Sequence, residues 1–243
     1  MPPPSPTTPD PSRGLFETVL VADGRPVRLA AHLDRLSGST AELFDQGLPA
    51  GLEEAIAAAA RPLALGRIRV DLLPEDDGTR FEIVAEPIDP AIFFPAKENG
   101  ADLRTIRHPE WAGAHKWADR DWLEAVEAEL GETVPVIVAD DEVLEAGRAN
   151  IFLVDDGTLA TPPADGRILP GTARAATVEL AGELGVEVAA RPLRAEDLRR
   201  SGEVFLTSSV KGLRPARYLD GEELRRGELT ARLAAELRRR WLA

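Results

Sequence analysis

The 243-residue chain is acidic, with 42 Asp and Glu against 29 Lys and Arg and a net charge of −13, which argues against a nucleic-acid-binding surface. It has no cysteine, which excludes disulfides, thiolate catalysis and cysteine-ligated zinc, and its three histidines stand in no metal-ligand spacing, so we expect no metal site. No apolar run approaches the roughly 18 residues that span a bilayer, and the proline-rich start lacks the apolar core of a signal peptide. We therefore expect a cytoplasmic protein.

The first part of the chain is predicted to be a short lead-in followed by a small α+β domain. Residues 1–13 are rich in proline, and we expect them to be disordered. Residues 14–98 form the predicted small domain, because alternating and helical spacings succeed one another there. Its predicted elements are a strand at 15–21, helices at 30–47 and 51–64, and a hairpin of strands at 67–73 and 80–85.

Residues 99–243 are predicted to form a larger domain. Short strands interrupted by single helices indicate an α+β fold with a mixed or antiparallel, barrel-like sheet. The predicted elements are a strand near Leu103, a helix at 117–130, a strand at 134–138, a hairpin of strands at 143–145 and 150–154, a helix at 172–184, strands near Val186 and at 203–207 and 214–219, and a last helix at 227–242.

Lysine is scarce in this chain, which has 26 arginines but only Lys97, Lys116 and Lys211. A desolvated lysine can lose its proton and form a Schiff base, whereas arginine stays protonated. Lys116 stands directly before the predicted helix at 117–130. Taken alone, a surface lysine beside a helix start is the more common explanation of such a position.

Four further features are each ambiguous alone. Glu145 is either an edge charge or a carboxylate that holds a protonated ring nitrogen. The Leu-Pro-Gly-Thr-Ala segment at 169–173 opens a helix whose first amides can bind a phosphate. The hydroxyls of the Thr-Ser-Ser segment at 207–209 are either ordinary turn residues or a second phosphate contact. Arg35, in a His-Leu-Asp-Arg-Leu helix, either snorkels or binds a phosphate bidentately.

Together and in this order, these segments resemble the class IV aminotransferases, which are fold type IV enzymes of pyridoxal 5′-phosphate (PLP). The resemblance begins with Gly-Leu-Phe-Glu-Thr at 14–18 and runs to about residue 220. It implies a two-domain fold, with a small α/β N-terminal domain and a larger, barrel-like, PLP-binding C-terminal domain. It also implies a homodimer.

By position, the resemblance makes Lys116 the catalytic Schiff-base lysine and Glu145 the partner of the pyridine nitrogen. Arg35 becomes a phosphate ligand, together with the amides of Thr172 and Ala173 and the hydroxyl of Ser209. Many relatives have a hydroxyl residue where Ala173 stands, so the phosphate either lacks one bond here or gains it from Thr172. The usual N-terminal strand and its Asp-Arg-Gly turn are missing, which leaves the first strand of the small domain uncertain.

Within the family, the chain is most similar to aminodeoxychorismate lyases. Ala-His-Lys-Trp-Ala-Asp-Arg at 114–120 and Phe-Leu-Thr-Ser-Ser-Val-Lys-Gly-Leu-Arg-Pro at 205–215 look like the lyase portions of fused p-aminobenzoate-synthesis proteins. Branched-chain enzymes usually carry a tyrosine a few residues after the lysine, where Asp121 stands here.

The resemblance implies conversion of 4-amino-4-deoxychorismate to 4-aminobenzoate and pyruvate, a step of folate biosynthesis. The freed Lys116 would remove the proton from the carbon that bears the amine. By placement, Arg107, Lys211 and Arg214 are candidates to bind the two substrate carboxylates. The alternatives are a PLP-dependent aminotransferase of branched-chain or D-amino acids, and a non-catalytic relative that binds PLP or a protein partner.

Overall fold

The computed structural model describes residues 4–243, which cluster into two compact units that interleave along the sequence. The small unit comprises Pro9–Phe93, His115–Arg120 and Trp241–Ala243, and the large unit comprises 4–8, Phe94–Ala114 and Asp121–Arg240. The sequence predicts a single domain boundary near residue 98. In the structure, the segment that contains Lys116 also belongs to the small unit. Residues 1–3 of the predicted lead-in lie outside the described residues, and Pro11–Arg13 forms a 3-10 helix, η1.

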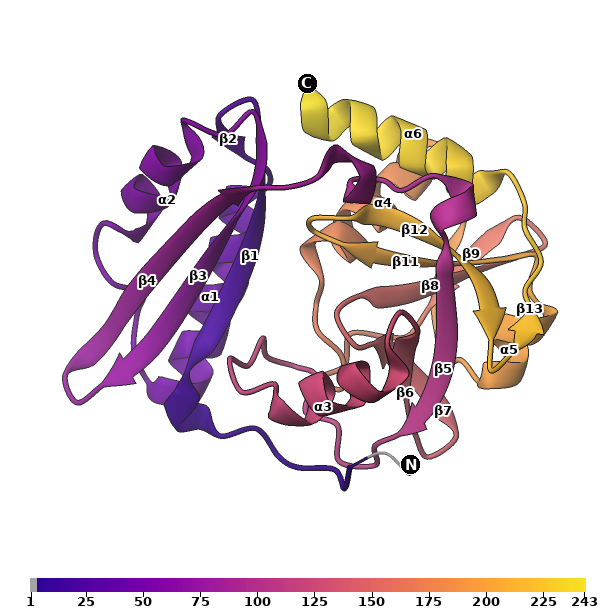
Figure 1. Cartoon of the computed structure of the whole chain (residues 1–243), viewed down its shortest axis with the longest axis horizontal. Helices are drawn as coiled ribbons and strands as arrows, with labels where there is room; N and C mark the ends of the chain where they lie inside the picture. Colours follow the sequence, from indigo (N-terminus) through magenta and orange to yellow (C-terminus); the bar gives the residue numbers. More distant parts are fainter. Residues whose placement is uncertain (1–3) are drawn as a thin grey trace. The chain divides into compact units, whose positions relative to one another are not determined.

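The small unit contains a sheet with two helices on one of its faces (Figure 1). The strand order is β2-β1-β3-β4, and every neighbouring pair is antiparallel. This arrangement confirms the predicted strands, hairpin and helices. The elements are β1 (Leu15–Ala22), β2 (Arg25–Pro26), α1 (Leu29–Phe44), α2 (Leu52–Ala60), β3 (Leu65–Glu75), β4 (Gly78–Pro87) and the short η2 (Pro90–Ile92).

The two faces of β1 have different surroundings, because side chains alternate along a strand. Leu15, Val19 and Val21 point to the helix side, where they share an apolar core with β3, α1 and α2. Glu17 has the same parity and therefore also points to α1, whereas Phe16 points to the opposite face. Helix α2 ends four residues before the predicted end, because Pro62 has no amide hydrogen and cannot donate a helical hydrogen bond.

The large unit is built on a nine-stranded sheet among the described residues, which curls on itself (Figure 1). The order is β10-β9-β8-β11-β12-β5-β6-β7, and β13 pairs with β12. Parallel pairs (β5 with β6 and β12, β9 with β10) mix with antiparallel ones, which confirms the predicted α+β, barrel-like class. The strands are β5 (Ala101–Arg107), β6 (Val134–Ala139), β7 (Glu142–Ala146), β8 (Asn150–Asp155), β9 (Thr158–Thr161), β10 (Val188–Ala190), β11 (Glu203–Ser208), β12 (Gly212–Leu219) and β13 (Glu222–Glu223).

Four α-helices and one 3-10 turn accompany this sheet among the described residues: η3 (Lys97–Asn99), α3 (Asp121–Leu130), α4 (Thr172–Glu183), α5 (Ala195–Arg200) and α6 (Leu229–Leu242). The predicted helix at 117–130 is wrong in its first four residues, because Trp117 bridges to Leu15 of β1 instead. The prediction that β7 and β8 pair with each other as a hairpin is also wrong. A single bridge, Ala146 to Ala149, joins them, while β7 pairs with β6 and β8 pairs with β9 and β11.

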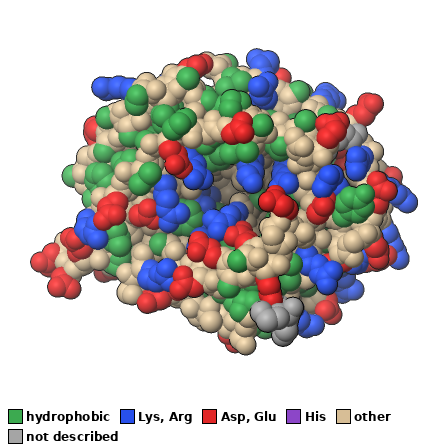
Figure 2. Space-filling view, in the orientation of Figure 1, with side chains coloured by type: hydrophobic (Ala, Val, Ile, Leu, Met, Phe, Trp, Pro, Cys, Tyr) green, Lys and Arg blue, Asp and Glu red, His purple; other side chains and the backbone are tan. Residues whose placement is uncertain are grey.

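Charged side chains of both signs are interspersed over the face of the molecule drawn in Figure 2. This mixture agrees with the many surface ion pairs, such as the one between Arg148 and Glu127. Within residues 4–243, no helix has the length and apolar character required to span a bilayer.

The strands β8 and β11 are joined through a pair of stacked rings, and this contact generates a test of the fold. Phe152 and Phe205 are both fully buried, lie opposite each other in the register, and have ring centroids 5.1 Å apart with an interplanar angle of 3°. Replacing Phe152 with Ala should lower the free energy of unfolding by about 3–5 kcal/mol, through lost burial and the cavity left behind. Urea unfolding measures this, with Val84→Ala as the control, because Val84 is 57% exposed and its truncation should change stability by less than about 0.5 kcal/mol.

Candidate active site

Lys116 lies in an extended segment that adds to the edge of β1 in the small unit. The amide of Phe16 donates to the carbonyl of Lys116 at 2.9 Å, and the amide of Ala118 donates to the carbonyl of Gly14 at 3.0 Å. Leu15 and Trp117 form an antiparallel bridge between these two bonds. The backbone on both sides of the lysine is therefore fixed by β1.

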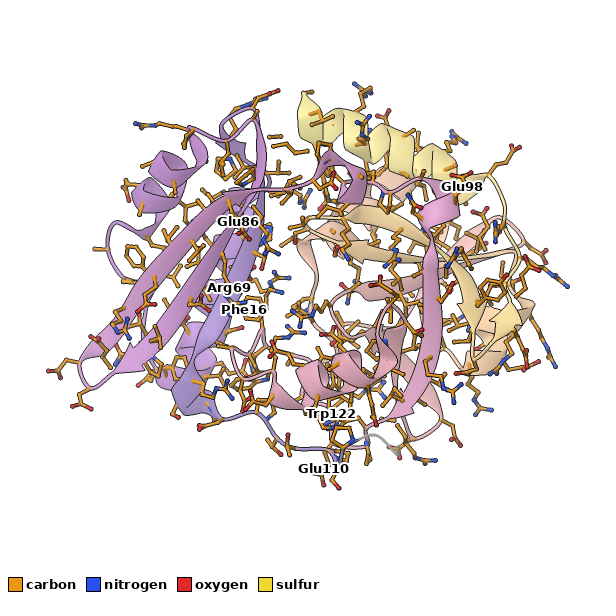
Figure 3. The ribbon with its side chains drawn as sticks, viewed as in Figure 1. Phe16, Arg69, Glu86, Glu98, Glu110 and Trp122 are labelled. Carbon is orange, nitrogen blue, oxygen red and sulfur yellow. The ribbon has the colours of Figure 1, made fainter. Side chains whose placement is uncertain are left out.

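The amine of Lys116 lies over the ring of Phe16, with Nζ 4.3 Å from the ring centroid. Two guanidinium groups share this ring: Arg69 of β3 at 4.1 Å and Arg120 at 5.3 Å. Phe16 and Arg69 are labelled in Figure 3. The Arg69 group is held from behind by Asp71, which accepts from Nε at 2.8 Å and from Nη2 at 2.6 Å. Three cations around one ring favour an anionic ligand beside the lysine.

On the helix side of β1, Glu17 is buried in a cluster with two residues of α1. Its carboxylate accepts from Nε and Nη2 of Arg35 at 2.8 and 2.7 Å, and from Nδ1 of His32 at 2.8 Å. Burial raises the pKa of Glu17, but the charge of Arg35 and the hydrogen bonds from His32 and Arg35 outweigh it and lower the pKa to about 2. Burial lowers the pKa of His32, so its ring is neutral at pH 7 and carries its proton on Nδ1, facing the carboxylate.

The large unit holds Glu145 near the end of β7, where its side chain is 5% exposed. Its carboxylate accepts from Nε1 of Trp111 at 2.8 Å, from the amide of Leu169 at 3.2 Å and from Nδ2 of Asn150 at 3.4 Å. A buried carboxylate requires such donors, because burial without them is costly. Gly113 permits this packing, since a Cβ there would lie 2.7 Å from Oε1 of Glu145 and 2.6 Å from Nε1 of Trp111.

The start of α4 is a group of amides and hydroxyls in the same unit. Thr172 and Ala173, its first residues, are both buried. The Thr172 hydroxyl lies 3.2 Å from the hydroxyl of Ser209, and within the described chain the buried Thr207 hydroxyl has no hydrogen-bond partner. Gly171 must be glycine here, since a Cβ would lie 2.0 Å from Oδ1 of Asn150. This arrangement suits a phosphate.

A family profile described as amino-transferase class IV matches residues 14–219 of the chain. The chain belongs to this family. Class IV aminotransferases are PLP-dependent enzymes, and the present chain is therefore a PLP-dependent enzyme.

Several relatives match this chain over nearly its whole length. A protein of Methanocaldococcus jannaschii, provisionally named a branched-chain-amino-acid aminotransferase, is 28% identical over 94% of this chain and 88% of its own. A hypothetical aminotransferase from Mycobacterium tuberculosis, solved in a PLP-bound form, gives a TM-score of 0.84 at 26% identity over 99% of this chain and 94% of its own. The 4-amino-4-deoxychorismate lyase from Pseudomonas aeruginosa gives a TM-score of 0.82 at 28% identity over 96% and 92%.

The residues of this class IV chain fit PLP in three respects. The backbone of Lys116 is fixed by hydrogen bonds to β1, and its amine lies over the ring of Phe16. Glu145 is a buried carboxylate with ordered donors, suited to a protonated ring nitrogen. At the start of α4 the hydroxyls of Thr172 and Ser209 lie 3.2 Å apart. The cofactor role of each residue stays a prediction from sequence.

The structure brings together some of the predicted site residues. Thr172, Ala173 and Ser209 lie side by side, whereas Arg35 is engaged by Glu17. Arg107 is exposed at the end of β5 and pairs with Asp141 at 4.0 Å. Lys211 and Arg214 lie at the start of β12, where Arg214 donates to the carbonyls of Asn99 and Gly100 at 3.1 Å.

Sequence reasoning missed the partners of the two central residues. Trp111 donates to Glu145 from a loop, and nothing in its local sequence indicates this contact. Arg69 and Arg120 surround Phe16 beside Lys116. The alternation Arg-Ile-Arg-Val-Asp-Leu at 67–72 could have indicated that Arg69 and Asp71 share the face of β3 opposite the core.

The low pKa of Glu17 predicts an acid-sensitive contribution to stability. Because the folded pKa of about 2 lies below the ordinary 4.5, the contribution is complete above pH 4.5 and is lost as the pH falls towards 2. Its size is on the order of 3 kcal/mol. Urea unfolding of the apoprotein between pH 6 and pH 2.5 should show a steeper loss in the wild type than in Glu17→Gln.

Glu86 supplies the matched control for this comparison, because it pairs with Arg67 on the exposed face of the same sheet. Glu86→Gln should keep the pH dependence of the wild type, since exposed ion pairs contribute little. Equal slopes for the wild type and Glu17→Gln would contradict the electrostatic account of the cluster.

Proposed function

We propose that this enzyme is an aminodeoxychorismate lyase, which converts 4-amino-4-deoxychorismate to 4-aminobenzoate and pyruvate. The observation that carries the proposal is the pair of guanidinium groups, Arg69 and Arg120, around Phe16 beside Lys116. This substrate bears two carboxylates, so it suits a site with more than one cation. A branched-chain amino acid has one carboxylate and an apolar side chain. The solved lyase from Pseudomonas aeruginosa supports the proposal as a relative that covers 96% of the chain.

In this proposal, PLP is held by the predicted residues. Lys116 would carry it covalently, Glu145 would keep a proton on its pyridine nitrogen, and the amides of Thr172 and Ala173 and the hydroxyl of Ser209 would bind its phosphate. Arg35 is assigned to the phosphate by the family resemblance. When bound, PLP supplies an electron sink for the negative charge that develops on the substrate carbon.

The remaining chemistry belongs to side chains of this enzyme. Released from PLP by the incoming substrate amine, the Lys116 amine would take the proton from the substrate carbon that bears the amine, as a general base beside the reacting centre. Arg69 and Arg120 bind the substrate carboxylates and hold that carbon near the base. The C–O bond to the neighbouring enolpyruvyl group would then break, the leaving enolate of pyruvate would take up the proton that Lys116 removed, and the carbocycle would become aromatic. Lys211 and Arg214 stay candidates for a carboxylate, and Arg107, exposed at the strand end, is a weaker one.

A class IV aminotransferase is the second candidate function, and the name of the Methanocaldococcus jannaschii relative favours it. It would use the same lysine and the same glutamate but pass the amine to a keto acid. Branched-chain and D-amino acids are the substrate classes to compare. A homodimer and a cytoplasmic location complete the proposal, both as expectations from the sequence.

The first test is turnover of 4-amino-4-deoxychorismate by the PLP-loaded protein without any keto acid. Pyruvate release is followed with lactate dehydrogenase, and 4-aminobenzoate is followed by its fluorescence. We expect equal amounts of both products over many turnovers, and no turnover by a folded Lys116→Ala variant. If protein that shows the visible band of lysine-bound PLP releases no pyruvate, the lyase proposal is wrong. Amino donors with 2-oxoglutarate then test the aminotransferase.

The role proposed for Glu145 predicts a loss of rate with the cofactor still bound. Glu145→Gln keeps the shape of the side chain and an oxygen that can accept from Trp111 or from Leu169, which donate to different carboxylate oxygens, but it no longer stabilises a protonated ring nitrogen. We expect kcat to fall roughly 10²–10³-fold, as for loss of a strong electrostatic partner in an active site. Steady-state kinetics measures the change, and the visible band of the variant shows that PLP is bound. A kcat within threefold of the wild type would remove Glu145 from the mechanism.

A further inference from the structure

His115, the residue directly before the lysine, reaches from the lysine segment to helix α1. Its Nδ1 lies 3.0 Å from the hydroxyl of Ser39, and its Nε2 lies 3.6 Å from Oε1 of Glu42. The histidine side chain is 11% exposed, whereas Glu42 is 71% exposed. The hydrogen bond to the buried Ser39 therefore contributes more than the ion pair with Glu42, which solvent screens.

Residues of α1 that contact this region share one helical face. Arg35, Ser39 and Glu42 are spaced by four and three residues, which places them on one side of the helix. Arg35 contacts Glu17 of β1, while Ser39 and Glu42 contact His115. One face of α1 therefore supports both β1 and the segment added to its edge.

Alternation along the extended segment explains how the lysine amine is directed. His115 contacts α1, and Trp117 packs against the apolar core between α1 and the small sheet. The two rings also meet edge to face, with centroids 5.3 Å apart. Because neighbouring side chains of extended backbone point to opposite sides, Lys116 must point away from α1, where its Nζ lies over Phe16.

We propose that His115 is a positioning residue for Lys116: anchored to Ser39 and Trp117, it stops the segment from rotating and presents the lysine amine on the Phe16 side of β1. The inference rests on the cofactor role proposed for Lys116. A lysine held in one orientation reacts at a higher effective concentration than one on a mobile segment. His115 itself takes no part in proton transfer.

The test is PLP binding and turnover by His115→Ala, His115→Asn and Ser39→Ala. PLP binding is measured by titrating the apoprotein and following the visible band of lysine-bound PLP. For His115→Ala we expect the apparent Kd for PLP to rise about tenfold and kcat to fall about tenfold or more, with KM changed less than twofold. His115→Asn should recover most of both losses, because its amide can still bond to Ser39. Ser39→Ala should show a smaller loss of the same kind.

Thr40 is the matched control on the same helix. It is fully buried, and its hydroxyl donates to the carbonyl of Leu36 one turn earlier, so its side-chain hydrogen bond lies within α1. Thr40→Ala should lower the melting temperature yet leave the Kd for PLP unchanged. Equal losses of PLP binding in Thr40→Ala and His115→Ala would overturn the inference, because destabilisation of α1 alone would explain both.

Two other outcomes separate the inference from the proposed function. In the first outcome, the wild type forms the visible band, and the His115→Ala variant matches the wild type in PLP binding and turnover. This result overturns only the role of His115. A wild-type protein that never forms the band overturns the cofactor role of Lys116, and the inference with it.

Discussion

The structure depends on the addition of a short extended segment to the edge of β1. Two backbone hydrogen bonds, between Phe16 and Lys116 and between Gly14 and Ala118, fix that segment. Arg13 and Asp119, paired at 2.8 Å, extend the connection beyond the bridge. Because of this pairing, the lysine belongs to the small unit although the chain before and after it belongs to the large one. The alternation of extended backbone then decides that Lys116 faces Phe16 and that its neighbours face α1.

The same alternation sorts the charges of the small unit into two environments. On the helix side, the buried charge of Glu17 is balanced by Arg35, while His32 stays neutral. On the other side, Lys116 lies with two guanidinium groups around one aromatic ring. A buried pair that is balanced holds β1 and α1 together, and an accessible group of cations attracts anionic ligands. The Glu17–Arg35 ion pair and the contact of the Lys116 amine therefore involve neighbouring residues of β1 that point in opposite directions, Glu17 and Phe16.

Much of the architecture follows from the sequence, because apolar alternation and helical spacing are local. The strands and helices of the small unit and the barrel-like class of the large sheet are readable in this way. The predictions that failed concern pairing between segments that lie far apart in the sequence. The segment 117–120 has the spacing of a helix, but pairing with Leu15, about 100 residues earlier, overrides it. Likewise β7 and β8 look like a hairpin, but the curled sheet gives each of them other partners. Arg69 and Arg120 meet over Phe16 only through strand register and the return of the lysine segment, neither of which is visible in the motifs.

The hydroxyls at the start of α4 belong to the proposed phosphate site and are tied to the loop that precedes the helix. Where the family resemblance implies a hydroxyl, this chain has Ala173, and the neighbouring Thr172 places its own hydroxyl 3.2 Å from that of Ser209. Glu145 and Asn150 hold the loop that precedes α4, because Asn150 donates to the carbonyl of Leu169 at 2.9 Å and also to Glu145. The loop that precedes α4 is therefore tied to the carboxylate, so a change in either one moves the other.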